Sequence, residues 1–162
     1  MNKSKSLIYQ ATFGDAAVDG LLSGLVAGIG MAGYLVLAGL TTGEGPGPVS
    51  YRQVLGRFAP DAEAAALTGG LMHLAVAGVY GMLFALGWWL LVRWRGVPAW
   101  LAGLAYGAAL LLVAETLILP STGSPLAEIP TVHFALAHGI YGVILGFLVG
   151  RNAEQSARRA ME

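Results

Sequence analysis

Three ionisable side chains interrupt otherwise apolar stretches of this sequence, and they are the residues best suited to chemistry. They are His73, Glu115 and His138. Two imidazoles could ligate a haem, and two imidazoles with one carboxylate could hold a metal ion. The residue types therefore predict His73 and His138 as candidate cofactor ligands. They also predict His73, Glu115 and His138 together as candidate ligands of a metal ion.

Two other interpretations of these residues remain open. A Glu–His pair could titrate and serve as a proton or quinone site around Glu115. Alternatively, the histidines could hydrogen-bond across helices, with Glu115 paired to a histidine or reaching the membrane surface. The sequence has no nucleophile–base motif, phosphate-binding loop or HExxH spacing, so a hydrolase or transferase is not expected. It also lacks cysteine, which excludes thiolate metal sites and thiol catalysis.

The composition is that of a chain surrounded by lipid. Of 162 residues, 56% are hydrophobic and 11% are charged, whereas soluble domains carry about 25% charged residues. The net charge is zero, so nothing indicates nucleic-acid binding. Four segments have the roughly 20 apolar residues that a membrane-spanning helix requires. They are residues 16–40, 67–91, 99–119 and 131–149. Because lipid cannot satisfy exposed backbone groups, we predict an all-α, integral membrane four-helix bundle that forms a single domain over residues 1–162.

The lysines and arginines predict the orientation of this bundle. Seven of the nine lie in the N-terminal segment, the middle loop and the C-terminal tail, which share one side in a four-span topology. Both termini are therefore expected on the cytoplasmic side of a multi-pass protein in the inner membrane of a prokaryote. On the outer side, Ser50 and Gln53 match a capping box. We expect a short amphipathic helix there, over residues 50–58 in the first outer loop.

Helix geometry predicts that the ionisable residues share one layer of the membrane. At about 1.5 Å of rise per residue, His73, Glu115 and His138 lie roughly 6 to 10 Å from the outer ends of their helices. Tyr34 of the first helix falls near the same depth. His73 and His138 each share a helix face with small residues, so both are expected to point into the bundle, whereas the facing of Glu115 is open. His133 lies on a different face from His138.

Small residues recur every fourth position along each span and predict close helix packing rather than a wide pore. The glycines expected to make these contacts are Gly24, Gly28, Gly81, Gly103, Gly107, Gly142 and Gly146. Residues 22–28 also resemble residues 101–107, and residues 79–83 resemble residues 140–144. This self-similarity predicts two tandem, similar helical hairpins related by an axis along the membrane normal.

Several features occur together in this chain: the glycine-rich first span, the loop segment 54–58, His73 early in the second span, and the segments 117–120 and 136–146. In this combination the chain resembles an uncharacterised family of small four-helix membrane proteins of bacteria and archaea, over roughly residues 16–150. The resemblance supports the topology and the importance of His138. Members of the family look like companions of respiratory oxidase machinery, so the resemblance implies an electron-transfer setting.

These features together predict a non-catalytic accessory subunit of a larger membrane complex, of respiratory or electron-transfer type. Its expected partners are the lipid bilayer and other membrane protein subunits, with no nucleic acid. The alternatives are a small haem- or metal-binding redox protein that uses His73 and His138, and a proton or quinone site around Glu115. Enzymatic activity stays open but is not favoured.

Overall fold

The structure, a computed structural model, describes residues 12–42, 62–92, 96–122 and 129–159. The described residues form helices and no strands. Four of these helices are long and apolar enough to cross a membrane, over Phe13–Ala38, Leu67–Leu90, Ala99–Ser121 and Thr131–Ser156. The predicted all-α architecture with four spans is therefore confirmed. The short amphipathic helix predicted over residues 50–58 lies outside the described residues.

The first helix, α1, covers Phe13–Thr42, and the second span is α3, Ala62–Gly87, continued by the π-helix η2, Trp88–Val92. The third span is α4, Ala99–Val113, which continues through the π-helix η4, Ala114–Ile118, and the short α5, Leu119–Thr122. The last helix, α6, covers Thr131–Arg159. We call the end of the bundle where α1 and α4 begin the proximal end. The opposite end, where α3 and α6 begin, is the distal end, and it corresponds to the predicted outer side.

Local hydrogen bonds define where three of the helices begin. At the start of α1, the Thr12 backbone N–H donates to Asp15 Oδ2 (2.9 Å) and the Asp15 N–H donates to Thr12 Oγ1 (3.2 Å). This reciprocal pair satisfies backbone donors that have no partner within the helix. α4 and α6 each follow a proline, whose carbonyl accepts the first N–H groups of the helix: Pro98 for α4 and Pro130 for α6.

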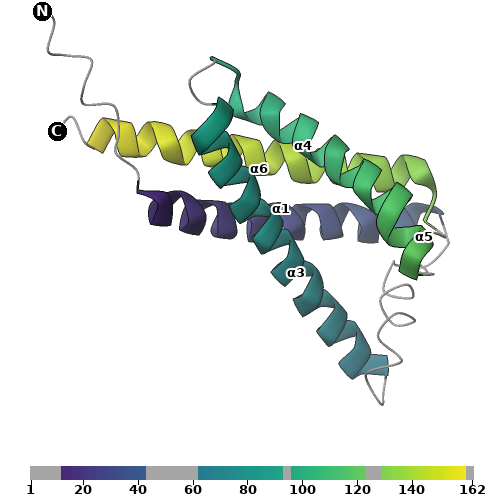
Figure 1. The fold of residues 1–162 in the computed structure, drawn as a ribbon. Coiled ribbons are helices and arrows are strands. Elements are labelled where there is room, and N and C mark those ends of the chain that lie inside the picture. The colour runs from purple at the N-terminus through teal and green to yellow at the C-terminus, as the bar shows by residue number, and fades with distance from the viewer. Residues whose placement is uncertain (1–11, 43–61, 93–95, 123–128, 160–162) are drawn as a thin grey trace, which may run out of the picture.

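The helices are not arranged as a symmetric square. α1 and α6 run side by side as a central pair, α3 packs on α1, and α4 packs on α6 (Figure 1). Within the described residues, α3 and α4 have few close backbone approaches to one another. The beginning of α3 runs away from the other helices, as its blue-teal end in Figure 1 shows. Consequently the bundle is tightest at its centre and opens toward the distal end of α3.

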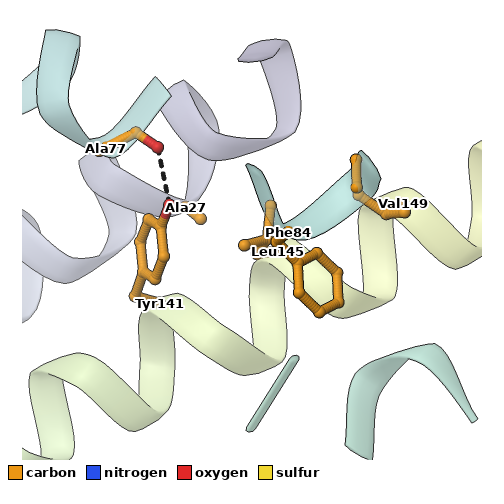
Figure 2. Packing of buried hydrophobic residues seen from close by; sticks show 7 residues of the cluster. Ala27, Ala77, Phe84, Tyr141, Leu145 and Val149 are labelled. Carbon is orange, nitrogen blue, oxygen red and sulfur yellow. Dashed lines mark hydrogen bonds between the residues drawn. The ribbon is translucent and has the colours of Figure 1, made fainter. Parts of the chain in front are cut away.

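A small core of alanine, leucine and aromatic side chains holds the central pair to α3. Ala27 of α1 and Leu145 of α6 are fully buried, and Tyr141 is 2% exposed. The Tyr141 hydroxyl donates to the carbonyl of Ala77 on α3 at 2.7 Å, and Figure 2 shows this bond beside Phe84 and Leu145. Hydrogen bonds of this kind stabilise contacts between membrane helices by roughly 0.6 kcal/mol on average. Tyr141 therefore joins α6 to α3 although the two backbones stay apart.

Glycines lie where α1 crosses α3 and where α4 crosses α6. On α1, a Cβ at Gly24 would meet the carbonyl oxygen of Ala77 and the backbone of Gly81 on α3. On α4, a Cβ at Gly103 would meet the carbonyl oxygen of Gly142 and lie 2.8 Å from the Gly146 Cα. The atoms that a side chain would meet at both places belong to backbone, which cannot move aside as a side chain can. Each hairpin therefore depends on glycine where its helices cross.

The two hairpins make the same kind of contact, but in a register one helical turn away from the sequence match. Gly81 packs between Gly20 and Gly24, just as Gly142 packs between Gly103 and Gly107. The sequence similarity instead aligns Gly24 with Gly103. A shift of four residues keeps small residues on the same helix face, so sequence alone does not distinguish the two registers.

The predicted two-fold arrangement of the hairpins is not confirmed by these contacts. A two-fold axis along the membrane normal would make α3 and α4 pack together as α1 and α6 do. Instead, the rings of Phe84 and Tyr106 lie between α3 and α4, with centroids 5.3 Å apart. The α1–α6 contact has small residues instead, including Ala27 and Gly30, and Ile144 Cδ1 lies 2.6 Å from where a Gly30 Cβ would be. Bulky side chains lie between α3 and α4, whereas small residues let α1 and α6 approach closely. This difference explains why the two hairpins are not related by a two-fold axis.

Candidate functional site

His138 on α6 is a buried imidazole in the distal half of the bundle. It is 8% exposed, and its Nδ1 donates to the Phe134 carbonyl one turn earlier at 2.8 Å. The Phe134 ring meets it edge to face at a centroid distance of 4.5 Å. Because Nδ1 carries the proton of the neutral ring, the lone pair is on Nε2. No donor among the described residues pairs with Nε2, so this nitrogen is the acceptor that the site presents.

Unlike His138, His73 on α3 uses its Nε2 in a hydrogen bond to the neighbouring helix. Its Nε2 donates to the Gly28 carbonyl of α1 at 3.0 Å. A Cβ at Gly28 would lie 3.7 Å from this Nε2 and 2.6 Å from the Ala77 Cβ, so the glycine admits both the histidine and the close helix contact. His73 therefore ties α3 to α1 just before α3 diverges.

Glu115 lies in the π-helix η4, a feature that was not predicted from the sequence. The Leu119 N–H donates to the Ala114 carbonyl, five residues earlier, which is the π-helical pattern. Pro120 provides the physical reason, because it has no N–H and its ring clashes with the carbonyl four residues before it. The Thr116 hydroxyl donates to the Leu112 carbonyl at 2.7 Å and satisfies an acceptor in this widened turn. The extra residue per turn changes the direction of Glu115, which is half-buried.

The three predicted residues do not form a metal site. In the part of the chain that the structure describes, no three His, Asp or Glu side chains could hold one metal ion. The set of His73, Glu115 and His138 is therefore not gathered as metal ligands.

A haem between the two histidines also fits this arrangement poorly. His138 has the orientation of a ligand, since ligating histidines donate their other ring N–H to a carbonyl or carboxylate. His73 already uses Nε2 in its bond to Gly28, and ligation through that atom would break the contact between α3 and α1. Of the two predicted haem ligands, His138 therefore has an Nε2 available for a ligand, whereas the Nε2 of His73 is engaged with Gly28.

His133 has a separate role from His138, in agreement with its different helix face. His133 Nδ1 and the Tyr34 hydroxyl are hydrogen-bonded at 2.9 Å. This bond joins the distal ends of α1 and α6. Tyr34 therefore belongs to the interface between the central helices.

Two tyrosine hydroxyl groups form polar contacts that the sequence analysis did not identify. Besides Tyr141, which bonds Ala77, the Tyr106 hydroxyl of α4 donates to the Tyr80 carbonyl of α3 at 3.0 Å. A signal for them exists in the sequence, since each directly precedes a glycine of the close helix contacts, in Tyr106-Gly107 and Tyr141-Gly142. A glycine at a crossing brings the neighbouring backbone within reach of the adjacent hydroxyl.

The site consists of the acceptor nitrogen His138 Nε2, flanked by the ring of Phe134. His73 is bonded across to α1, and Glu115 is half-buried in η4. Compared with known proteins, this chain matches no protein-family model, no curated protein and no solved structure.

Proposed function

We propose that this protein is a non-catalytic accessory subunit of a larger membrane complex. The observation that carries the proposal is the distal part of α3. Five of the six residues from Leu67 to Met72 are exposed, and only Gly69 on the remaining side of the helix is buried. Thr68 and Gly70 are among the exposed residues, and no atom of another helix among the described residues lies within 4 Å of a Cβ placed at Gly70.

The chemistry of this exposed segment favours a protein neighbour over lipid alone. Exposed glycine and threonine lower the apolar area that lipid tails can contact, whereas small residues let another membrane helix approach closely. The third span adds to this surface. Only 11% of its most apolar 18-residue stretch is buried, compared with 44% of the corresponding stretch in the fourth span. A helix from another subunit that packs along α3, beside α4, would cover both.

We further propose that the complex is of the respiratory or electron-transfer type, which the family resemblance implies, and that both termini are cytoplasmic, as the charge distribution implies. The chain lacks cysteine, so single cysteines can report the orientation. In cells treated with a membrane-impermeant maleimide, Ser121→Cys at the distal end should be labelled and Ser156→Cys should not. The reverse labelling would contradict the orientation.

A photoreactive residue placed on α3 tests the accessory-subunit proposal. Met72 on α3 and Leu22 on α1 are matched positions, with 54% and 55% of their surfaces exposed. After illumination of native membranes, a photo-crosslinker at Met72 should capture one defined membrane protein in high yield. The same group at Leu22, on a face of large apolar residues, should capture lipid. Equal protein capture at both positions, or lipid alone at Met72, would argue against a partner on α3.

A further inference from the structure

We propose that the proximal end of the bundle binds an anionic phospholipid, with the guanidinium group of Arg151 on α6 donating hydrogen bonds to its phosphate group. The bound lipid lies against the rim where α6 meets the first turn of α4. This inference goes beyond the accessory role. It requires no partner subunit, so the isolated protein can test it.

The two ends of the bundle carry opposite charge. The sequence segments in which helices begin, end or are joined at the proximal end are residues 1–20, 93–95 and 151–162, and they contain seven basic and four acidic residues. The corresponding distal segments, residues 43–63 and 115–128, contain two basic and five acidic residues. Because opposite charges attract and like charges repel, an anionic headgroup is drawn to the proximal end and repelled from the distal end.

The length of α6 places Arg151 at the surface of the membrane. From Thr131, where α6 begins, to Arg151 the helix rises about 30 Å, which is the thickness of the hydrocarbon core. The helix then continues to Arg159, and Figure 1 shows its yellow end extending beyond the start of α4. Arg151 therefore lies at the level where acyl chains end and phosphate groups begin.

The exposed face of α6 changes from apolar to basic at this level. Val143 and Phe147 are 38% and 58% exposed, and Arg151, the next residue at the same spacing, is exposed too. Side chains four residues apart share a helix face, so the surface that suits acyl chains leads directly to a guanidinium group. Arginine can bind a phosphate group through two parallel hydrogen bonds. One lipid molecule can therefore contact both parts of this face.

The first turn of α4 lies at the same level as Arg151. A Cβ at Gly150 would lie 2.8 Å from the Ala99 Cβ, and a Cβ at Gly146 would lie 2.8 Å from the Trp100 Cα. Arg151 directly follows Gly150, so it lies where α4 begins. Trp100 is 49% exposed, and tryptophan rings are enriched at the depth of lipid headgroups. Two neighbouring helices thus place a basic residue and an interfacial aromatic residue on the same rim.

Arg158 provides a matched control on the same helix. It is exposed like Arg151, but it lies about 10 Å further along the helix, on the aqueous side of the rim. Glu154 lies between the two arginines, and a glutamate four residues before a basic residue is the more favourable order for such a pair on a helix. Glu154 therefore favours Arg158 as its partner, and Arg151 is the arginine that can meet the lipid.

Native mass spectrometry of the purified protein in a mild detergent measures lipid binding directly. Titration with phosphatidylglycerol should give a dissociation constant at least about tenfold lower than titration with phosphatidylcholine of the same acyl chains. Arg151→Gln should remove most of this preference, because glutamine keeps a polar side chain without the charge, whereas Arg158→Gln should retain it. Both arginines are exposed, so both variants should fold with unchanged helicity.

Glycerol phosphate separates a lipid site from a site for free phosphate. It carries the same phosphate group without acyl chains, so an excess of it should not displace phosphatidylglycerol. The proposal would be overturned by such displacement, by equal binding of the two lipids, or by a lipid preference that Arg151→Gln leaves unchanged or that both variants lose equally. None of these outcomes would affect the accessory-subunit role.

Discussion

Replacing Gly142 with valine is expected to destabilise the bundle by about 3 kcal/mol, the upper range for overpacking a tight contact. A Cβ at this position would meet the carbonyl oxygen of Gly103 and would lie 2.9 Å from the Gly103 carbonyl carbon and 3.2 Å from the Gly107 nitrogen. All three atoms are backbone, so no rotamer change relieves the contact and α4 must move away from α6. The measurement is reversible unfolding in mixed micelles, followed by circular dichroism.

Gly33 is the matched control for this substitution. It also lies within a membrane-spanning helix, α1, but no atom of another helix in the described part of the chain lies within 4 Å of a Cβ placed there. Gly33→Val should therefore change the free energy of unfolding by less than about 0.5 kcal/mol, as surface substitutions usually do. If both variants lose the same stability, valine acts through helix propensity or lipid contact, and the close α4–α6 contact is not what stabilises the hairpin.

Gly70→Trp is expected to release the partner subunit while leaving the isolated bundle folded. No atom of the described residues lies within 4 Å of a Cβ at Gly70, so tryptophan has space within this chain. A partner helix packed closely on the same position has no such space. We expect at least about tenfold less partner to co-purify, with unchanged helicity and unfolding of the subunit itself.

Gly33→Trp again provides the control, because Gly33 is equally open but lies on α1 between exposed Ile29 and Leu37. This surface of large apolar side chains is suited to lipid, so the variant should retain its partner. Equal loss of partner from both variants would mean that bulk in the membrane, rather than contact on α3, disrupts the complex. Retention in both would show that the distal part of α3 is not the contact.

The spans and the glycines of the crossings could be predicted because both depend on local chemistry. Apolar length defines a span, and a glycine every fourth residue marks a helix face. Which helices pack against one another could not be predicted in this way. The α1–α6 contact depends on Gly30 receiving Ile144, and the separation of α3 from α4 depends on Phe84 and Tyr106. These are fits between distant segments, and no periodicity within one segment encodes them.

For the candidate site, the sequence predicts the depth of the residues but not their hydrogen bonds. Helix rise alone places His73, Glu115 and His138 in one layer. The partners of the two imidazoles are backbone carbonyls, of Gly28 and of Phe134, and every residue has such a carbonyl. Only the helix crossing and the rotamer select one of them. The π-turn at Glu115 has a visible cause in Pro120, but whether a proline kinks, ends or widens a helix depends on what can satisfy the freed carbonyls.

The mass of the native assembly tests the central claim, that this bundle is a subunit of a larger membrane complex, most directly. Native mass spectrometry would be recorded on the wild-type protein, extracted from its own membranes in a mild detergent without crosslinking. The account predicts a stable assembly in which each copy of this chain is accompanied by at least one different membrane protein in fixed stoichiometry. A population that contains only this chain, with or without bound lipid, would contradict it.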